Sequence, residues 1–80
     1  MLKGYVIIVK NYVAEICEFT TISIITTVDG TRLYYVRTKH GEDYFKEDEL
    51  SPVKKALEKS CKELNEALRG VYEGSANKAR

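Results

Sequence analysis

The chain has 80 residues, with 13 Lys and Arg residues against 12 Asp and Glu residues and a formal net charge of +1. This length leaves room for one domain with a thin core, because so short a chain buries only about 60–65% of its unfolded surface. The balanced charge lacks the basic excess of non-specific nucleic-acid binders. The longest apolar run, residues 5–9, is far shorter than the roughly 20 residues of a membrane-spanning helix. We therefore expect a cytoplasmic protein without a membrane segment.

The first half of the chain has the composition of a β-sheet. Residues 1–50 are rich in Val, Ile, Thr and Tyr, which suit a pleated surface. Residues 6–9 predict a first strand, Asn11 a turn, and residues 12–17 a second strand, although a short helical turn over residues 12–17 is an open alternative. Together with the hairpins described next, this predicts four to five antiparallel strands.

Two dipeptides predict β-hairpins. Asp29-Gly30 lies between β-branched runs, and His40-Gly41 is a weaker version of the same signal, because Gly accepts the positive φ of a type I′ turn. Two-residue loops at both places would fix the strand register. The predicted pairs are Ile24 with Tyr35, Ile25 with Tyr34, Thr26 with Leu33, Val36 with Phe45, Arg37 with Tyr44, and Lys39 with Glu42. Both faces of this sheet are apolar near the first hairpin, so we expect cover on both sides.

The second half of the chain predicts a single helix. Ser51 is a suitable N-cap with Pro52 at the first helical position, and Gly70 or Gly74 would end the helix. We therefore expect one domain over residues 1–72, with a sheet or barrel at 1–50 and a helix at 51–72, followed by a flexible tail at 73–80. An apolar stripe on this helix could cover the sheet or form a homodimer seam. Its proposed self-association residues are Leu57, Cys61, Leu64, Leu68 and Val71.

The sequence argues against catalysis and against a bound metal or cofactor. Cys17 and Cys61 are expected to be reduced, buried thiols, with a disulfide left open as an alternative. His40, the one histidine, is expected to be a turn residue, and no histidine is expected to lie against either cysteine. Structural zinc requires about four Cys or His ligands at close spacing. We therefore expect no catalytic residue, no metal site, no cofactor and no enzymatic activity.

One strand face carries interleaved aromatic and basic side chains. Such a face can stack bases and contact phosphate, while Glu42 and Asp43 beside it would oppose an anion. Ordinary cross-strand pairs at the rim of a sheet are the alternative interpretation. The candidate binding residues on this face are Tyr35, Arg37, Lys39, Tyr44 and Lys46.

A resemblance to a known type of fold rests on five short segments, which are Asp29-Gly30, Tyr34–Arg37, Gly41-Glu42, Tyr44-Phe45 and Glu47–Leu50. They resemble small SH3-like or Tudor-like barrels, especially the short barrel-plus-helix proteins of bacteriophages and prophages. The resemblance implies an α+β protein, an SH3-like barrel followed by a C-terminal helix. It also implies a phage or mobile-element protein that acts in a bacterial host cell.

The expected function is therefore non-enzymatic binding of a protein partner, such as a host factor or defence system that the chain would block. The apolar sheet surface and the lack of converging catalytic groups motivate this expectation. Homodimer formation is part of it. The alternative is a nucleic-acid-binding SH3-like module that uses the aromatic and basic strand face.

Overall fold

The first two strands form a long hairpin on which the rest of the molecule is built. In the computed structural model, which describes residues 1–78, β1 (Lys3–Lys10) pairs antiparallel with β2 (Val13–Thr26) as far as Thr20. Asn11 and Tyr12 form the turn, with φ values of 52° and 64°. Positive φ at both central residues is typical of a type I′ turn, whose twist suits a two-residue hairpin. The predicted turn at Asn11 and the strand after it are confirmed.

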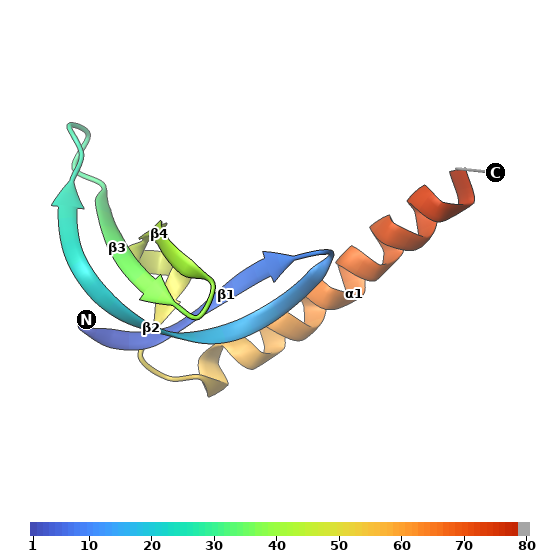
Figure 1. The fold of residues 1–80 in the computed structure, drawn as a ribbon, viewed down its shortest axis with the longest axis horizontal. Coiled ribbons are helices and arrows are strands. Elements are labelled where there is room, and N and C mark those ends of the chain that lie inside the picture. The colour runs from blue at the N-terminus through green and yellow to red at the C-terminus, as the bar shows by residue number, and fades with distance from the viewer. Residues whose placement is uncertain (79–80) are drawn as a thin grey trace.

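The remaining strands extend this hairpin into a curved, five-stranded sheet (Figure 1). β3 (Arg32–Thr38) pairs with β2, β4 (Gly41–Lys46) pairs with β3, and the short β5 (Leu50–Ser51) returns to β1. A 3₁₀ turn, η1 (Glu47–Glu49), joins β4 to β5. The order is β4-β3-β2-β1-β5, and all pairings are antiparallel. The predicted α+β class, with five strands and a C-terminal helix, is confirmed, and the arrangement is compatible with an SH3-like fold.

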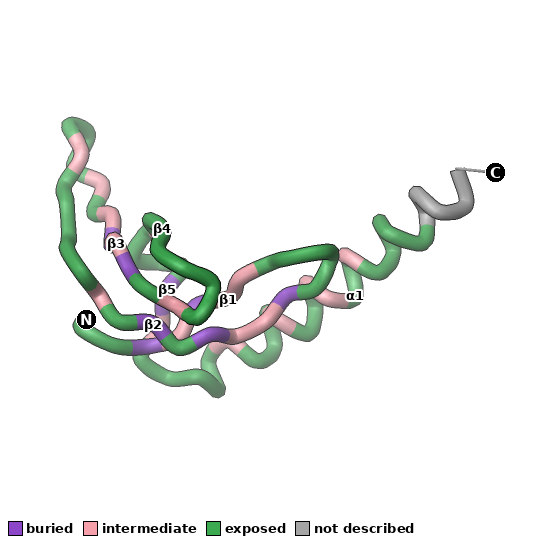
Figure 2. Tube along the Cα trace, in the orientation of Figure 1, coloured by how far each residue is buried: buried purple, intermediate pink, exposed green. Residues whose placement is uncertain are grey.

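The hydrophobic core lies on one face of the sheet, which we call the inner face. It draws on four strands that are far apart in the sequence, and Ile8 and Phe45 pack against its margin. Its most enclosed members, Val6 and Val36, lie on β1 and β3, and the buried segments are all on strands (purple in Figure 2). The buried cluster consists of Val6, Phe19, Tyr34, Val36 and Leu50.

Gly4 allows β5 to approach β1 at the edge of this core. A Cβ atom at this position would lie 2.5 Å from the Ser51 carbonyl oxygen and 2.9 Å from the Phe19 ring. Neither neighbour has free space to move, because one is backbone and the other is a buried ring. The absence of a side chain is therefore a packing requirement here.

The C-terminal helix, α1 (Lys55–Lys78), differs at both ends from the helix predicted at residues 51–72. Ser51 is not its N-cap, because Ser51 pairs with Tyr5 in the sheet and its hydroxyl oxygen accepts a hydrogen bond from the Val53 N–H at 3.1 Å. Pro52 consequently lies in the connection rather than at the first helical position. The helix also continues through Gly70 and Gly74, since a glycine inside a helix costs only about 1 kcal/mol. Residues 79–80 of the predicted tail lie outside the described residues.

The predicted register of the Asp29-Gly30 hairpin is wrong by one residue. The Gly30 N–H donates to the Thr27 carbonyl at 3.0 Å, and Gly30 then has a φ of 89°. This is a β-turn followed by a glycine bulge, which makes the loop three residues long rather than two. Ile24 therefore pairs with Tyr34, where the prediction placed Ile25. A slip of one residue exchanges the two faces of a strand.

The register of the second hairpin is wrong by two residues, which leaves its faces unchanged. The loop is Lys39-His40, and Gly41, with a φ of 109°, already belongs to β4. Arg37 consequently pairs with Glu42 rather than Tyr44. Because side chains alternate with a period of two, a shift of two residues moves the partners but keeps each side chain on its face.

The expectation of cover on both sides of the sheet is met for only part of the molecule. α1 lies along β2 near the β1–β2 turn, far from the β2–β3 turn (Figure 1). Residues 22–32, which we call the hairpin tip, extend past the core at the end of the molecule that α1 does not cover. Ile22, Ile24 and Ile25 are each 40–44% exposed there, and Val28 is fully exposed.

Candidate functional site

Three of the five candidate binding residues lie together on the outer face of β3 and β4. Tyr35 and Tyr44 are directly opposite each other, with ring centroids 4.6 Å apart and planes tilted by 37°. Arg37 donates to Glu42 Oε2 through Nε at 3.0 Å and through its terminal nitrogen at 2.8 Å. The Tyr35 hydroxyl donates to Glu42 Oε1 at 2.7 Å. The predicted Arg37–Tyr44 and Lys39–Glu42 pairs are therefore replaced by contacts that converge on Glu42.

Glu42 controls the electrostatics of this outer face. The hydrogen bond from Tyr35 and the contact with Arg37 hold the pKa of the Glu42 carboxyl below its ordinary value. The same hydrogen bond raises the pKa of the Tyr35 hydroxyl. Glu42 thus stays ionised beside Arg37 and compensates its charge. The face is consequently less basic than its residue types indicate.

Of the other two candidates, Lys46 follows Tyr44 by two residues on β4 and so shares the outer face, whereas Lys39 lies apart. Lys39 is in the β3–β4 turn, and its ammonium donates to Glu15 Oε2 at 2.9 Å. Lys46 ends β4 opposite Leu33, and its backbone N–H donates to Glu49 Oε1 at 2.8 Å. Four of the five candidates therefore share one face, and Lys39 contacts Glu15 instead.

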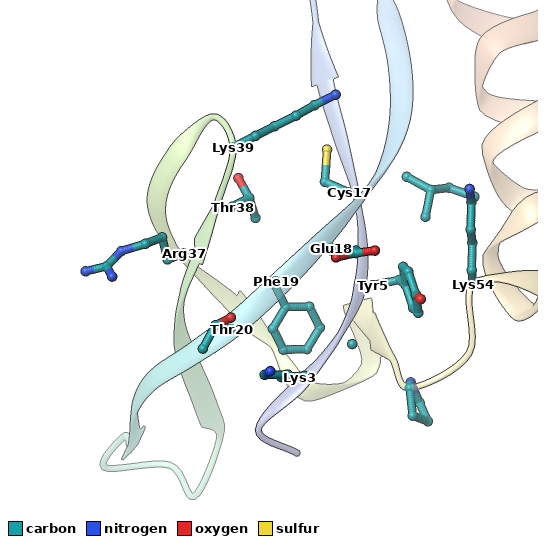
Figure 3. Close-up of a pocket in the computed structure, with 13 residues that line it drawn as sticks. Lys3, Tyr5, Cys17, Glu18, Phe19, Thr20, Arg37, Thr38, Lys39 and Lys54 are labelled. Atoms are coloured by element: carbon teal, nitrogen blue, oxygen red, sulfur yellow. The ribbon is translucent and has the colours of Figure 1, made fainter.

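An open groove of about 930 Å³ crosses the sheet from β1 to β3 (Figure 3). Four basic side chains line it, and Glu18 is the acidic residue in its lining. Arg37 and Lys39 are engaged by Glu42 and Glu15, while Lys3 and Lys54 lie on the β1 side and at the start of α1. We call this the basic groove, and its cations are Lys3, Arg37, Lys39 and Lys54.

A cluster that the sequence analysis missed lies where the β3–β4 turn approaches β2. Glu15 Oε1 lies 2.9 Å from His40 Nε2 and 3.3 Å from Cys17 Sγ. One ligand-type atom from each of the three residues lies within 4.8 Å of the other two. The expectation that no histidine lies against a cysteine is therefore wrong. The spacing of Glu15 and Cys17, two residues apart on a strand, was a signal that both point to one face.

The ionisation of this Glu15 cluster (Glu15, Cys17 and His40) follows from its contacts. Hydrogen bonds from His40, Lys39 and Cys17 lower the pKa of Glu15 to about 2. Burial, together with the hydrogen bond to Glu15, raises the pKa of Cys17 to about 11. A thiol with so high a pKa is a weak nucleophile. The cluster consequently does not have the ionisation of a Cys–His nucleophile.

The hairpin tip combines exposed apolar side chains with an unpaired strand edge. β1 accompanies β2 only as far as Thr20, and the Leu2 carbonyl accepts a hydrogen bond from the Thr21 N–H at 2.7 Å. Within residues 1–78, no strand lies beside the β1-facing edge of residues 22–26. β3 pairs with the other edge. β4 continues beside β3 as far as Leu33, so residues 23–25 form the open edge strand of a three-stranded part of the sheet.

The helix stripe proposed for self-association lies partly against the sheet. Leu57, Cys61, Leu64 and Leu68 are half-buried, whereas Val71 is exposed. On the same side of α1, the Asn65 amide accepts a hydrogen bond from the Ala14 N–H at 2.7 Å and donates one to the Ala14 carbonyl at 2.9 Å. Cys17 and Cys61 are both free thiols. Homodimerisation through the stripe remains a prediction.

No protein-family model matches the chain, and no significant match was found among curated proteins or among solved structures. Within residues 1–78, no helix combines the length and the apolar character that a membrane crossing requires.

Proposed function

We propose that the chain is a non-enzymatic protein-binding module that receives an extended segment of its partner along the free edge of β2. The observation that carries this proposal is the unpaired edge of residues 22–26 together with the exposed isoleucines on both of its faces. Strand addition to an exposed edge is an established mode of peptide recognition. Main-chain hydrogen bonds supply affinity there, and alternate side chains supply specificity.

The amino-acid sequence of this edge favours pairing with another strand over exposure to water. Residues 21–26 contain no charged residue, no Pro and no Gly, and consist of β-branched residues and one Ser. A long, uncharged and apolar edge is a pairing site for other chains, which soluble proteins usually block with Lys, Pro or a bulge. Residues 21–26 have a bulge at Ile22 but no Lys or Pro, and residues 23–26 beyond the bulge pair in regular register with β3. Burying a fully exposed isoleucine contributes about 1.5–3 kcal/mol. Ile24 and Ile25 are 40% and 44% exposed, so covering both would contribute about 1–2.5 kcal/mol together.

The bulge at Ile22 shows how the tip presents apolar groups to both sides. The β2–β3 register shifts between Thr21 and Ser23, so the alternation of faces is interrupted there. Beyond the bulge, Ile24 shares the inner face with Tyr34, and Ile25 lies opposite Leu33 on the outer face. An added strand would therefore find an apolar neighbour on each side of the sheet.

The test compares protein capture by the native chain and by a variant of the tip. In Ile22→Thr/Ile25→Thr, the strand keeps β-branched residues but loses its apolar surface, and Val53→Thr removes a comparably exposed apolar group outside the tip. We expect immobilised full-length protein to capture a partner from nuclease-treated host lysate, quantified by mass spectrometry. The amount of partner captured by the double variant should fall at least about tenfold, which corresponds to 1.4 kcal/mol. Val53→Thr should capture as much partner as the native chain.

Hydrogen exchange identifies the mode of binding. In the complex, the backbone amides of residues 22–26 should exchange more slowly, because an added strand protects the edge. Capture that is equal for all three proteins, or protection that is absent from this edge, would contradict the proposal. Sedimentation of the purified chain distinguishes a second copy from another protein as the occupant.

Nucleic-acid binding is the second candidate, and the basic groove is the observation that favours it. Lys3 and Lys54 line the groove, and Tyr35 and Tyr44 lie beside Arg37 on the outer face. Glu18 and Glu42 oppose a polyanion at the same place. This function requires oligonucleotide binding that weakens steeply with salt and falls in Lys3→Ala/Lys54→Ala. The wider role of a phage or mobile-element protein that blocks a host factor in the bacterial cytoplasm rests on the SH3-like resemblance alone.

A further inference from the structure

We propose that Glu15, Cys17 and His40 form a binding site for a divalent transition-metal ion, with Zn²⁺ as the best-matched ion. The proposal is independent of the free β2 edge, because the cluster lies at the opposite end of β2. It rests on the three kinds of ligand atom that the fold brings together there.

The fold itself assembles these ligands. Glu15 and Cys17 are two residues apart on β2, so both side chains point to one face of the sheet. β3 leaves β2 after Arg37, and the two-residue turn that follows carries His40 back over that face. The imidazole thereby meets the carboxylate of a residue 25 positions earlier in the chain. A local sequence motif would not show this cluster, since it depends on the β2–β3–β4 topology.

The distances are close to the edges of a zinc tetrahedron, although the Glu15–His40 contact is shorter than such an edge. Zinc bonds of about 2.0–2.3 Å to N, O and S ligands place neighbouring ligand atoms about 3.3–3.8 Å apart. Glu15 Oε1 lies 2.9 Å from His40 Nε2 and 3.3 Å from Cys17 Sγ, and all three atoms lie within 4.8 Å of one another. Small side-chain rotations would therefore bring all three atoms onto one ion, with the Cys17 thiol proton released to water as the Cys17–metal bond replaces the hydrogen bond to Glu15.

The two oxygens of Glu15 already have separate partners. Oε1 faces Cys17 and His40, whereas Oε2 accepts the hydrogen bond from the Lys39 ammonium at 2.9 Å. Glu15 can thus bind an ion through Oε1 while Lys39 orients the carboxylate from outside, as outer partners of metal ligands commonly do. Three protein ligands leave a fourth position that a water molecule would fill.

The ligand set selects the class of ion. Thiolate and imidazole favour Zn²⁺ and Co²⁺, whereas Mg²⁺ and Ca²⁺ prefer sites made only of oxygen atoms. Cys17 is 3% exposed and His40 is at the rim of the cluster, so an ion would enter from the side of the β3–β4 turn. We therefore expect Zn²⁺ or Co²⁺ to bind while Mg²⁺ does not.

The experiment titrates reduced, metal-free, full-length protein with ZnCl₂ by calorimetry and with Co²⁺ by absorption spectroscopy. We expect one ion per chain, a sulfur-to-cobalt charge-transfer band, and a rise in Tm with Zn²⁺. His40→Ala should weaken Zn²⁺ more than about 100-fold, beyond the 10- to 100-fold that loss of an outer partner costs. Cys61→Ser is the matched control, because it removes the other thiol and should leave the affinity unchanged.

Other outcomes would overturn the site. Unchanged Zn²⁺ affinity in His40→Ala, loss of binding in Cys61→Ser, or no binding by the native chain would show that the cluster is an ion pair and hydrogen-bond network only. Cys17→Ser should remove the charge-transfer band. Because Cys17 is buried, this variant is interpreted only where circular dichroism shows a native fold, and His40→Ala carries the test otherwise.

Discussion

The two ends of β2 are alike in topology but differ in how their edges are treated. β2 is longer than either neighbour, so its start extends beyond β3 and its end extends beyond β1. At the start, the Asn65 amide of α1 bonds both the N–H and the carbonyl of Ala14, as a neighbouring strand would. At the other end, no strand within the described chain lies on the β1-facing edge of residues 22–26. The fold therefore protects one overhang of β2 and leaves the other open.

This difference indicates which end of β2 serves the packing of the fold and which end is available for binding a partner. The protected end adjoins buried residues such as Ala14 and Cys17, whereas the open end has exposed isoleucines. A free edge is a liability that proteins manage explicitly. Where the chain manages one edge with a dedicated side chain, leaving the other open is consistent with a partner that pairs there.

The largest expected effect contrasts the two halves of β2 directly. Phe19→Ala removes a side chain that is 3% exposed at the centre of the core, so we expect a loss of about 3–5 kcal/mol in the free energy of unfolding. Ile25→Ala at the open end should cost within about 1 kcal/mol, because the side chain is already solvated. Urea denaturation of both variants measures the contrast. Equal losses would show that the hairpin tip is part of the core.

Asn65→Ala tests the protected end, with an intermediate expected effect. The change leaves the buried Ala14 N–H without its partner, and such a group costs about 1–3 kcal/mol. Hydrogen exchange at Ala14 should accelerate, and the protein should self-associate more readily through the newly opened edge. Glu66→Ala, at the next and exposed position of α1, is a suitable control with little expected change.

The smallest expected effect concerns the pH dependence of stability at the Glu15 cluster. The pKa of Glu15 is lowered to about 2, so ionised Glu15 stabilises the fold above its ordinary pKa of 4.5. This contribution should be lost as the pH falls from 4.5 toward 2. The difference in stability between the native chain and Glu15→Gln should therefore be present at pH 6 and vanish near pH 2. Thermal denaturation of both proteins across this pH range measures the difference. A difference in stability that does not change with pH would contradict this account.

The sequence predicts which helices and strands form better than it predicts how the strands pair. The strand-rich half, the Asn11 turn and the C-terminal helix follow from local preferences. The registers do not, because the Asp29-Gly30 loop has one residue more than the simplest hairpin, and the bulge at Ile22 interrupts the alternation of faces. Helix-start signals at Ser51-Pro52 are overridden by pairing of Ser51 with β1.

The candidate sites also divide into contacts that could be predicted and contacts that could not. Tyr35, Arg37 and Tyr44 could be placed together because a two-residue error in register preserves their face. The meeting of His40 with Glu15 and Cys17 could not be predicted, because it depends on where β3 separates from β2 and on which residues form the next turn. Long-range contacts of this kind need the whole topology.

The paired hydrogen bonds of Asn65 also fix the position of α1 along its own axis. Cys61, one turn before Asn65, already donates to the Ala14 carbonyl at 3.4 Å. A helix advances about 5.4 Å per turn, so a slip by one turn would put Cys61 or Arg69 in the place of Asn65. Arg donates but cannot accept, and a thiol does both only weakly. A sliding movement of α1 would therefore leave a backbone group unsatisfied in either direction. The two Asn65 hydrogen bonds therefore oppose translation of α1 along its axis.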